Sequence, residues 1–184
     1  MERLILYDGL QENDILVASG YLGWRLIRDR TENDGLRQFI WKACQDKATV
    51  YYTFDPILKV SFLDFDGDNA GEAIGQAYAG FPIYFPNELS EIISPDDDDS
   101  TAMRKLAHTA ASAQANPKPE YGEVFASGLR HPLSRVREGA AYAIAHASLR
   151  IFSNLLKEAA EQDESPEVRS MAEELLIYLE QEGL

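Results

Sequence analysis

Small and apolar residues recur with helical spacing through the second half of the chain. Three segments start with an apolar residue followed by arginine, at Met103, Val136 and Val168, and further small or apolar residues follow four and seven positions later. Residues with this spacing share one face of an α-helix. The three starts lie 33 and 32 residues apart, a period typical of stacked helical hairpins. The pattern therefore predicts an array of helical repeats, an architecture that exposes continuous binding surfaces.

Turn residues separate the predicted helices of this half. Pro117 and Pro119 mark one turn. Ser165, Pro166 and Glu167 open the last helix, because Pro suits the first helical turn and an acid suits its positive dipole end. The predicted helices pair as residues 120–129 with 134–146, and residues 149–161 with 166–181.

The first half of the chain lacks this repeat and predicts two helices near its start. Residues 15–28 follow a capping segment and offer apolar side chains for burial. A second helix is expected after Gly35, with apolar residues at positions 36, 39, 40 and 43. The two would form a helical hairpin.

Residues 49–54 are β-branched and aromatic, and residues 58–65 alternate in part between apolar and polar positions. Asp55 and Pro56 break the chain between them, so two strands joined by a turn are predicted. Residues 70–79 are expected to return to helix.

Acidic residues outnumber basic ones and give the chain a net charge of −14. Residues 1–99 hold 19 Asp and Glu against 8 Lys and Arg, whereas residues 100–184 hold 12 against 9. Direct binding to nucleic acid is disfavoured, since phosphate contacts require basic side chains. A basic protein partner, or a cation, suits this charge better.

A run of four Asp, residues 96–99, separates the two compositions, and we place the domain boundary there, giving domains 1–95 and 96–184. The run could bind a cation or a basic partner. We interpret it as a solvated loop, because adjacent side chains converge poorly on one ion and acids favour the start of the following helix.

Cys44 is the single cysteine, which excludes an intrachain disulfide and favours a reducing compartment. The N-terminus lacks the pattern of a signal peptide, and no run approaches the ~20 apolar residues of a membrane span. We therefore expect a cytoplasmic protein that makes no membrane contact.

Residues 131–141 and 165–172 resemble the loop and second helix of the HEAT repeat family. The resemblance covers roughly residues 87–181 and implies helical hairpins that stack into a curved solenoid. It also implies that Arg104, Arg137 and Arg169 bond to acidic or carbonyl groups between repeats, the alternative being a row of ligand-binding arginines.

Together these features predict a fold class of mostly α (α+β): an N-terminal helical region with a small β-hairpin, followed by HEAT-like α-hairpin repeats. If second helices line the concave side, as the family implies, one set of side chains points outward from it. The set comprises Glu138, Tyr142, His146, Glu174 and Tyr178.

Three acids at the end of the second predicted strand, Asp64, Asp66 and Asp68, admit several interpretations. The segment resembles the first motif of the haloacid-dehalogenase phosphatases, which would make Asp64 a nucleophile and Asp66 an acid/base beside Mg²⁺. Asp68 replaces the usual Thr of that motif. A calcium loop is also conceivable, but Asn69 stands at its glycine position. A turn rich in Asp and Gly explains the segment without an ion.

We expect no catalysis, because the three histidines lack metal-ligand spacing and no nucleophile elbow or phosphate loop is present. The favoured function is a non-catalytic protein-binding module without a cofactor, such as an acidic inhibitor or immunity protein that covers a basic toxin. Asp64, Asp66 and Asp68 would join the concave residues in binding the partner. The alternatives are a Mg²⁺-dependent phosphatase at Asp64 and Asp66, or a bilin-handling protein, since short HEAT-like arrays occur in such proteins.

Overall fold

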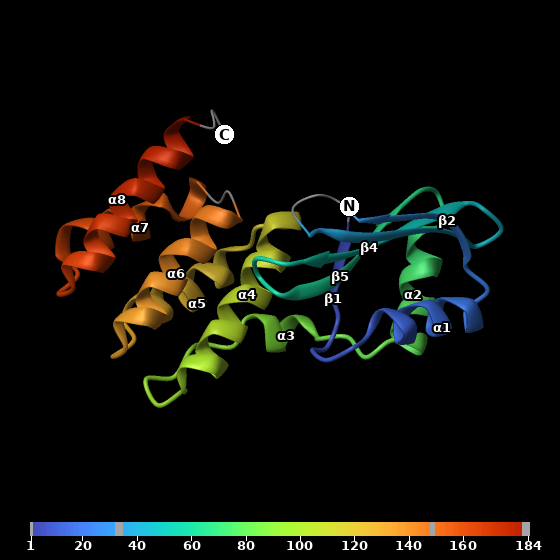
Figure 1. The fold of residues 1–184 in the computed structure, drawn as a ribbon, viewed down its shortest axis with the longest axis horizontal. Coiled ribbons are helices and arrows are strands. Elements are labelled where there is room, and N and C mark those ends of the chain that lie inside the picture. The colour runs from blue at the N-terminus through green and yellow to red at the C-terminus, as the bar shows by residue number, and fades with distance from the viewer. Residues whose placement is uncertain (1, 32–34, 148–149, 182–184) are drawn as a thin grey trace. The chain divides into compact units, whose positions relative to one another are not determined.

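The computed structural model describes residues 2–31, 35–147 and 150–181, and the chain divides into two units (Figure 1). The first unit is Met1–Phe85 and the second is Pro86–Leu184. The predicted boundary after residue 95 lies inside the second unit.

The first unit is built on a five-stranded sheet with the order β1-β5-β4-β3-β2. Every neighbouring pair of strands is antiparallel. β2 to β5 follow one another as a meander, and β1 pairs with β5 on the far edge. The strands are β1 (Glu2–Ile5), β2 (Arg25–Thr31), β3 (Arg37–Ala43), β4 (Ala48–Asp55) and β5 (Val60–Asp66).

Two helices, α1 (Glu12–Tyr21) and α2 (Ala70–Gly80), lie on the same side of this sheet (Figure 1). The strand register places Leu63, Tyr52 and Phe39 in one row on that side. All three are buried, as are Ala73 and Ala77 of α2. Burial of this aromatic and aliphatic row against the helices supplies the core of the first unit.

The prediction of an N-terminal helical region is wrong. Residues 15–28 were expected to form one helix, but α1 ends at Tyr21 and the chain enters β2. Gly23 has a φ of +74° between them, a left-handed conformation that stops a helix and that glycine adopts without steric cost. The helix expected after Gly35 is β3, in which Phe39, Trp41 and Ala43 are buried in alternation.

Other expectations for this unit agree with the structure. The two predicted strands are β4 and β5, and the helix expected at residues 70–79 is α2. The region is therefore a sheet of five strands with two helices, where the prediction had helices and a small β-hairpin.

All secondary-structure elements in the described part of the second unit are helices. It starts with α3 (Pro86–Leu89) and the long α4 (Asp99–Ala115). α5 (Pro119–Leu129) and α6 (Ser134–His146) then form one antiparallel hairpin, and α7 (Ser153–Gln162) and α8 (Pro166–Gln181) form the next. A short 3₁₀ turn, Arg150–Phe152, precedes α7.

The helices of this unit make two layers. α6 packs between α4 and α8, so these three helices form one layer, while α5 and α7 form the other. The predicted helices at residues 134–146 and 166–181 match α6 and α8. Within the described residues, no helix combines the length and the apolar character that crossing a bilayer requires.

Candidate protein-binding surface on α6 and α8

The exposed side of α6 carries Glu138, Tyr142 and His146 at intervals of four residues, so they form a stripe along one face of the helix. α8 repeats this arrangement 32 residues later with Ser170, Glu174 and Tyr178, and α8 packs beside α6. Five of these six residues are the concave-side residues predicted from the sequence. We call the six residues the α6/α8 stripe.

Both tyrosines of the α6/α8 stripe are accessible to a partner. Tyr142 is 42% exposed and Tyr178 is 47% exposed. The Tyr142 and His146 rings stack at 9° with centroids 6.0 Å apart, which holds both in a defined orientation. A partly exposed Tyr offers a large apolar ring and a hydroxyl group at low entropic cost, and such residues often anchor protein interfaces.

The opposite side of α6 fixes the position of the stripe. Val136, Ala140 and Ile144 are completely buried. Gly128 of α5 lets that helix approach closely, because a Cβ there would lie only 2.9 Å from the Ala140 Cβ. Small residues at these contacts allow the helices to pack at short distance, so α6 presents its stripe from a rigid base.

Arg137 ties the α5/α6 hairpin to the α7/α8 hairpin. Its guanidinium donates to both carboxylate oxygens of Asp163, at 2.9 and 3.1 Å, and to the carbonyl oxygens of His131 and Pro132. The hydrogen bond to Asp163 raises the pKa of Arg137 and outweighs the effect of burial. Arg169 also donates to the Asp163 carbonyl oxygen. Arg137 therefore bonds between two hairpins, as the resemblance implied, whereas this bond of Arg169 lies within the α7/α8 hairpin. Arg104 is exposed on α4.

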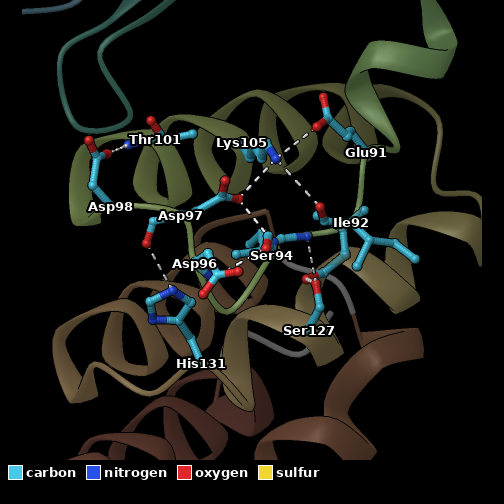
Figure 2. A network of polar contacts seen from close by, with 12 residues as sticks. Glu91, Ile92, Ser94, Asp96, Asp97, Asp98, Thr101, Lys105, Ser127 and His131 are labelled. Atoms are coloured by element: carbon cyan, nitrogen blue, oxygen red, sulfur yellow. Dashed lines mark hydrogen bonds and ion pairs between the residues drawn. The ribbon is translucent and has the colours of Figure 1, made fainter.

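α4 would continue the stripe, but the preceding chain covers it (Figure 2). Lys105, Thr109 and Ala113 occupy the positions that correspond to Glu138, Tyr142 and His146. Lys105 Nζ binds Glu91 and Asp97, each at 2.9 Å. The Thr109 hydroxyl donates to the Leu89 carbonyl oxygen at 2.8 Å. Among the described residues, the stripe positions of this layer are therefore open on α6 and α8 but covered on α4.

The four consecutive aspartates make separate contacts rather than one site. Asp98 caps α4 by accepting a hydrogen bond from the Thr101 amide at 2.7 Å, and this bond lowers the pKa of Asp98. Asp97 accepts from the Ser94 amide as well as from Lys105. Burial acts to raise the pKa of Asp97, but these hydrogen bonds outweigh it and lower the pKa.

Asp99 of the same run faces Arg135 at 3.2 Å. His131 Nδ1 accepts from the Leu133 amide, and its Nε2 lies 3.2 Å from the Asp97 carbonyl oxygen (Figure 2). The segment leads into a helix, as interpreted from the sequence, but it is not fully solvated, since the Asp97 side chain is only 17% exposed in its ion pair with Lys105.

The acids of β5 do not form one group either. Asp64 is buried and binds Arg3 through two hydrogen bonds of 2.8 Å. The Arg3 guanidinium lies over the Phe62 ring, 3.7 Å from its centroid. Asp66 and Asp68 are exposed on either side of Gly67. Of the three acids predicted to contact a partner, only these last two are accessible to one.

The phosphatase arrangement also lacks its framework in the described chain, since the sheet is antiparallel at every pairing. A nucleophile and an acid at the carboxyl edge of a parallel sheet cannot be assembled from it. Among the described residues, no group of three or more His, Cys, Asp and Glu side chains is arranged to hold a metal ion.

The first unit also contains an aromatic hollow that was not predicted from the sequence. A cavity of about 210 Å³ is lined by Tyr7, Tyr78, Phe81, Pro82, Ile83 and Phe85. These residues come from the segment after β1, from α2 and from the segment after α2. The aromatic and proline run at residues 81–86 was the signal in the sequence, but it does not show which other residues join it.

Comparison of the chain with known protein families, with curated proteins and with solved structures found no match.

Proposed function

We propose that this chain is a non-catalytic, cytoplasmic protein-binding module that covers a basic protein partner with the α6/α8 stripe, as an inhibitor or immunity protein does. The observation that carries the proposal is the stripe itself: neighbouring rows of acidic and aromatic side chains on two packed helices, with Tyr142, Glu174 and Tyr178 exposed and Glu138 and His146 partly exposed. We further propose that the second unit is a short array of the HEAT type.

The distribution of charge supports a basic partner. Residues 86–184 hold 18 Asp and Glu against 9 Lys and Arg, so the helical unit carries most of the net charge. Glu138 precedes Tyr142 by four residues on α6, and Glu174 precedes Tyr178 by four residues on α8, so each glutamate lies one helical turn from a tyrosine of the stripe. An acidic surface accelerates encounter with a basic protein, and its tyrosines supply contact area once the two have met.

Charge reversal within the stripe tests the proposal. Tagged full-length protein first captures partners from its host, and the basic protein released by high salt is purified. Its affinity is then measured for the wild type and for the double variant Glu138→Lys/Glu174→Lys. We expect at least a tenfold loss of affinity at low salt and a smaller loss at high salt, because salt screens exposed charges.

The matched control is Glu123→Lys/Glu161→Lys, which changes the net charge equally at exposed positions on α5 and α7. This control should bind the partner nearly as tightly as the wild type does. Equal losses in both double variants would show that only net charge matters and would remove the stripe as the site. Failure to capture any basic protein would remove the proposed function itself.

A further inference from the structure

The aromatic hollow of the first unit carries an inference that is independent of the α6/α8 stripe. Three of its lining side chains are both aromatic and accessible: Tyr7 is 38% exposed, Tyr78 is 40% and Phe85 is 54%. The other three, Phe81, Pro82 and Ile83, complete an apolar lining, and Phe81 and Ile83 are buried. Exposed aromatic rings gathered at a hollow form a surface that a ligand can enter.

Contacts among the rings hold them in place. Tyr78 and Phe85 stack at 13° with centroids 6.0 Å apart, and the Tyr7 centroid lies 4.3 Å from that of Tyr84. Phe81 in turn packs against Trp24 of the core, with centroids 5.7 Å apart. The hollow is therefore preformed, and ligand binding does not have to order it.

Two carboxylates, those of Asp8 and Glu2, lie near the rings. Asp8 accepts a hydrogen bond from the Tyr84 hydroxyl at 3.2 Å, next to Tyr7. Glu2 is close enough to Tyr78 to act on it electrostatically, and burial together with Glu2 raises the pKa of the Tyr78 hydroxyl. The phenol stays neutral at physiological pH, while both carboxylates favour a cation.

We infer that the aromatic hollow binds a quaternary ammonium group. The faces of Tyr and Phe rings attract cations, and a quaternary ammonium carries no N–H donor that an apolar lining would leave unsatisfied. The volume of about 210 Å³ accommodates a trimethylammonium head. The group could belong to a small molecule such as choline or to a trimethyl-lysine side chain in a protein.

The test compares choline with its uncharged isostere 3,3-dimethylbutan-1-ol, each titrated into the full chain and followed by NMR. Tyr78→Leu keeps an apolar side chain but removes the ring, and Tyr21→Leu removes an exposed Tyr of α1 as the control. Choline should bind the wild type and Tyr21→Leu equally, Tyr78→Leu should bind it about fivefold more weakly, and Tyr78→Phe should restore the affinity. Tryptophan fluorescence verifies that each variant keeps the core around Trp24.

Equal binding of choline and the uncharged isostere would overturn the inference, because the hollow would then be merely apolar. Absence of binding by both choline and a trimethyl-lysine peptide, or tighter binding of N-acetyl-arginine amide than of either, would also overturn it. Two further ligands distinguish the sources: a short peptide with trimethyl-lysine and the same peptide with unmodified lysine. Tenfold tighter binding of the trimethylated peptide than of choline would assign the site to a modified protein, and the reverse order would assign it to a small molecule.

Discussion

Arg137 and Asp163, which lie in different helical hairpins, form a bidentate ion pair with side chains only 6% and 5% exposed. Asp163 also accepts a hydrogen bond from the Ser165 amide, at the turn that leads into α8. The carboxylate therefore organises the turn and fixes the neighbouring helix at once. The positions of Tyr142 and Tyr178 relative to each other depend on this pair.

Replacing Asp163 with Ala should strongly destabilise the helical unit. The change removes the buried countercharge of the Arg137 guanidinium and leaves only the exposed Glu164 beside it, at a cost of about 3–5 kcal/mol. Urea unfolding followed by far-UV circular dichroism measures it. Both tryptophans lie in the first unit, so tryptophan fluorescence follows that unit separately. Arg135→Ala, which removes an exposed ion pair with Asp99, should cost under about 1 kcal/mol; an equal cost would contradict the special role of Asp163.

Gly128→Ala should destabilise the contact between α5 and α6. The new methyl group would lie 2.9 Å from the Ala140 Cβ and 3.0 Å from Leu106, and overpacking of this kind costs about 1–3 kcal/mol. Gly75→Ala on α2 is the control, since its methyl group meets no atom within 4 Å. That change should stabilise the first unit by about 0.5–1 kcal/mol. Thermal unfolding shows whether each variant has a lower or a higher melting temperature than the wild type. A higher melting temperature for Gly128→Ala would contradict the packing described.

Stability should fall on acidification partly through Asp97. Its folded-state pKa is lowered, so its contribution is complete above the ordinary Asp pKa of about 4 and is lost as the pH falls toward the folded-state value. Asp97→Asn should therefore be less stable than the wild type at pH 7, and the difference should narrow below about pH 4. The urea midpoints of the two proteins at several pH values test this prediction. A stability difference between wild type and Asp97→Asn that grows as the pH falls would refute it.

Deprotonation of Lys105 removes the stabilising ion pair with Asp97 at high pH. Burial acts to lower its pKa, but hydrogen bonds to Glu91 and Asp97 outweigh burial and raise it. The stabilisation is thus present below the ordinary Lys pKa of about 10 and is lost as the pH rises through the folded-state value. The difference between wild type and Asp97→Asn should stay constant at intermediate pH.

Tyr142→Ala and Tyr178→Ala should each leave the association rate of the proposed partner unchanged and raise its dissociation rate. An interface anchor contributes about 2 kcal/mol, or roughly thirtyfold in affinity, mostly through the dissociation rate. Surface plasmon resonance separates the two rates. Tyr21→Ala is the control, since this almost fully exposed Tyr belongs to the first unit. A change of less than twofold in both stripe variants would exclude the tyrosines as anchors.

The helical repeats could be predicted because their pattern is local. α6 and α8 match their predicted bounds, since apolar spacing, Pro166 and the acid after it act within one helix. β3 could not be predicted with the same rules. Its apolar residues at 36, 39, 40 and 43 fit a helical period, while the alternation of Phe39, Trp41 and Ala43 fits a strand.

Pairing with distant residues decides between these periods. Phe39 lies opposite Tyr52, and Trp41 lies opposite Val50, contacts that no local pattern contains. The two candidate binding surfaces differ in the same way, because one depends on local spacing and the other on contacts between distant segments. Glu138 and Tyr142 follow one helical face and were identified, whereas Tyr7, Tyr78 and Phe85 come from separate segments that only the folded chain brings together.

Coverage of α4 by the segment before it limits the size of what the stripe alone can hold. Two neighbouring helices of 13 and 16 residues present a footprint on the order of 400 Å², given their length and spacing. A stable complex commonly buries about 800 Å² on each partner. A folded partner must therefore also contact the loops that adjoin α6 and α8. A partner that binds through a single helix or an extended segment needs a smaller interface, which these two helices can supply alone.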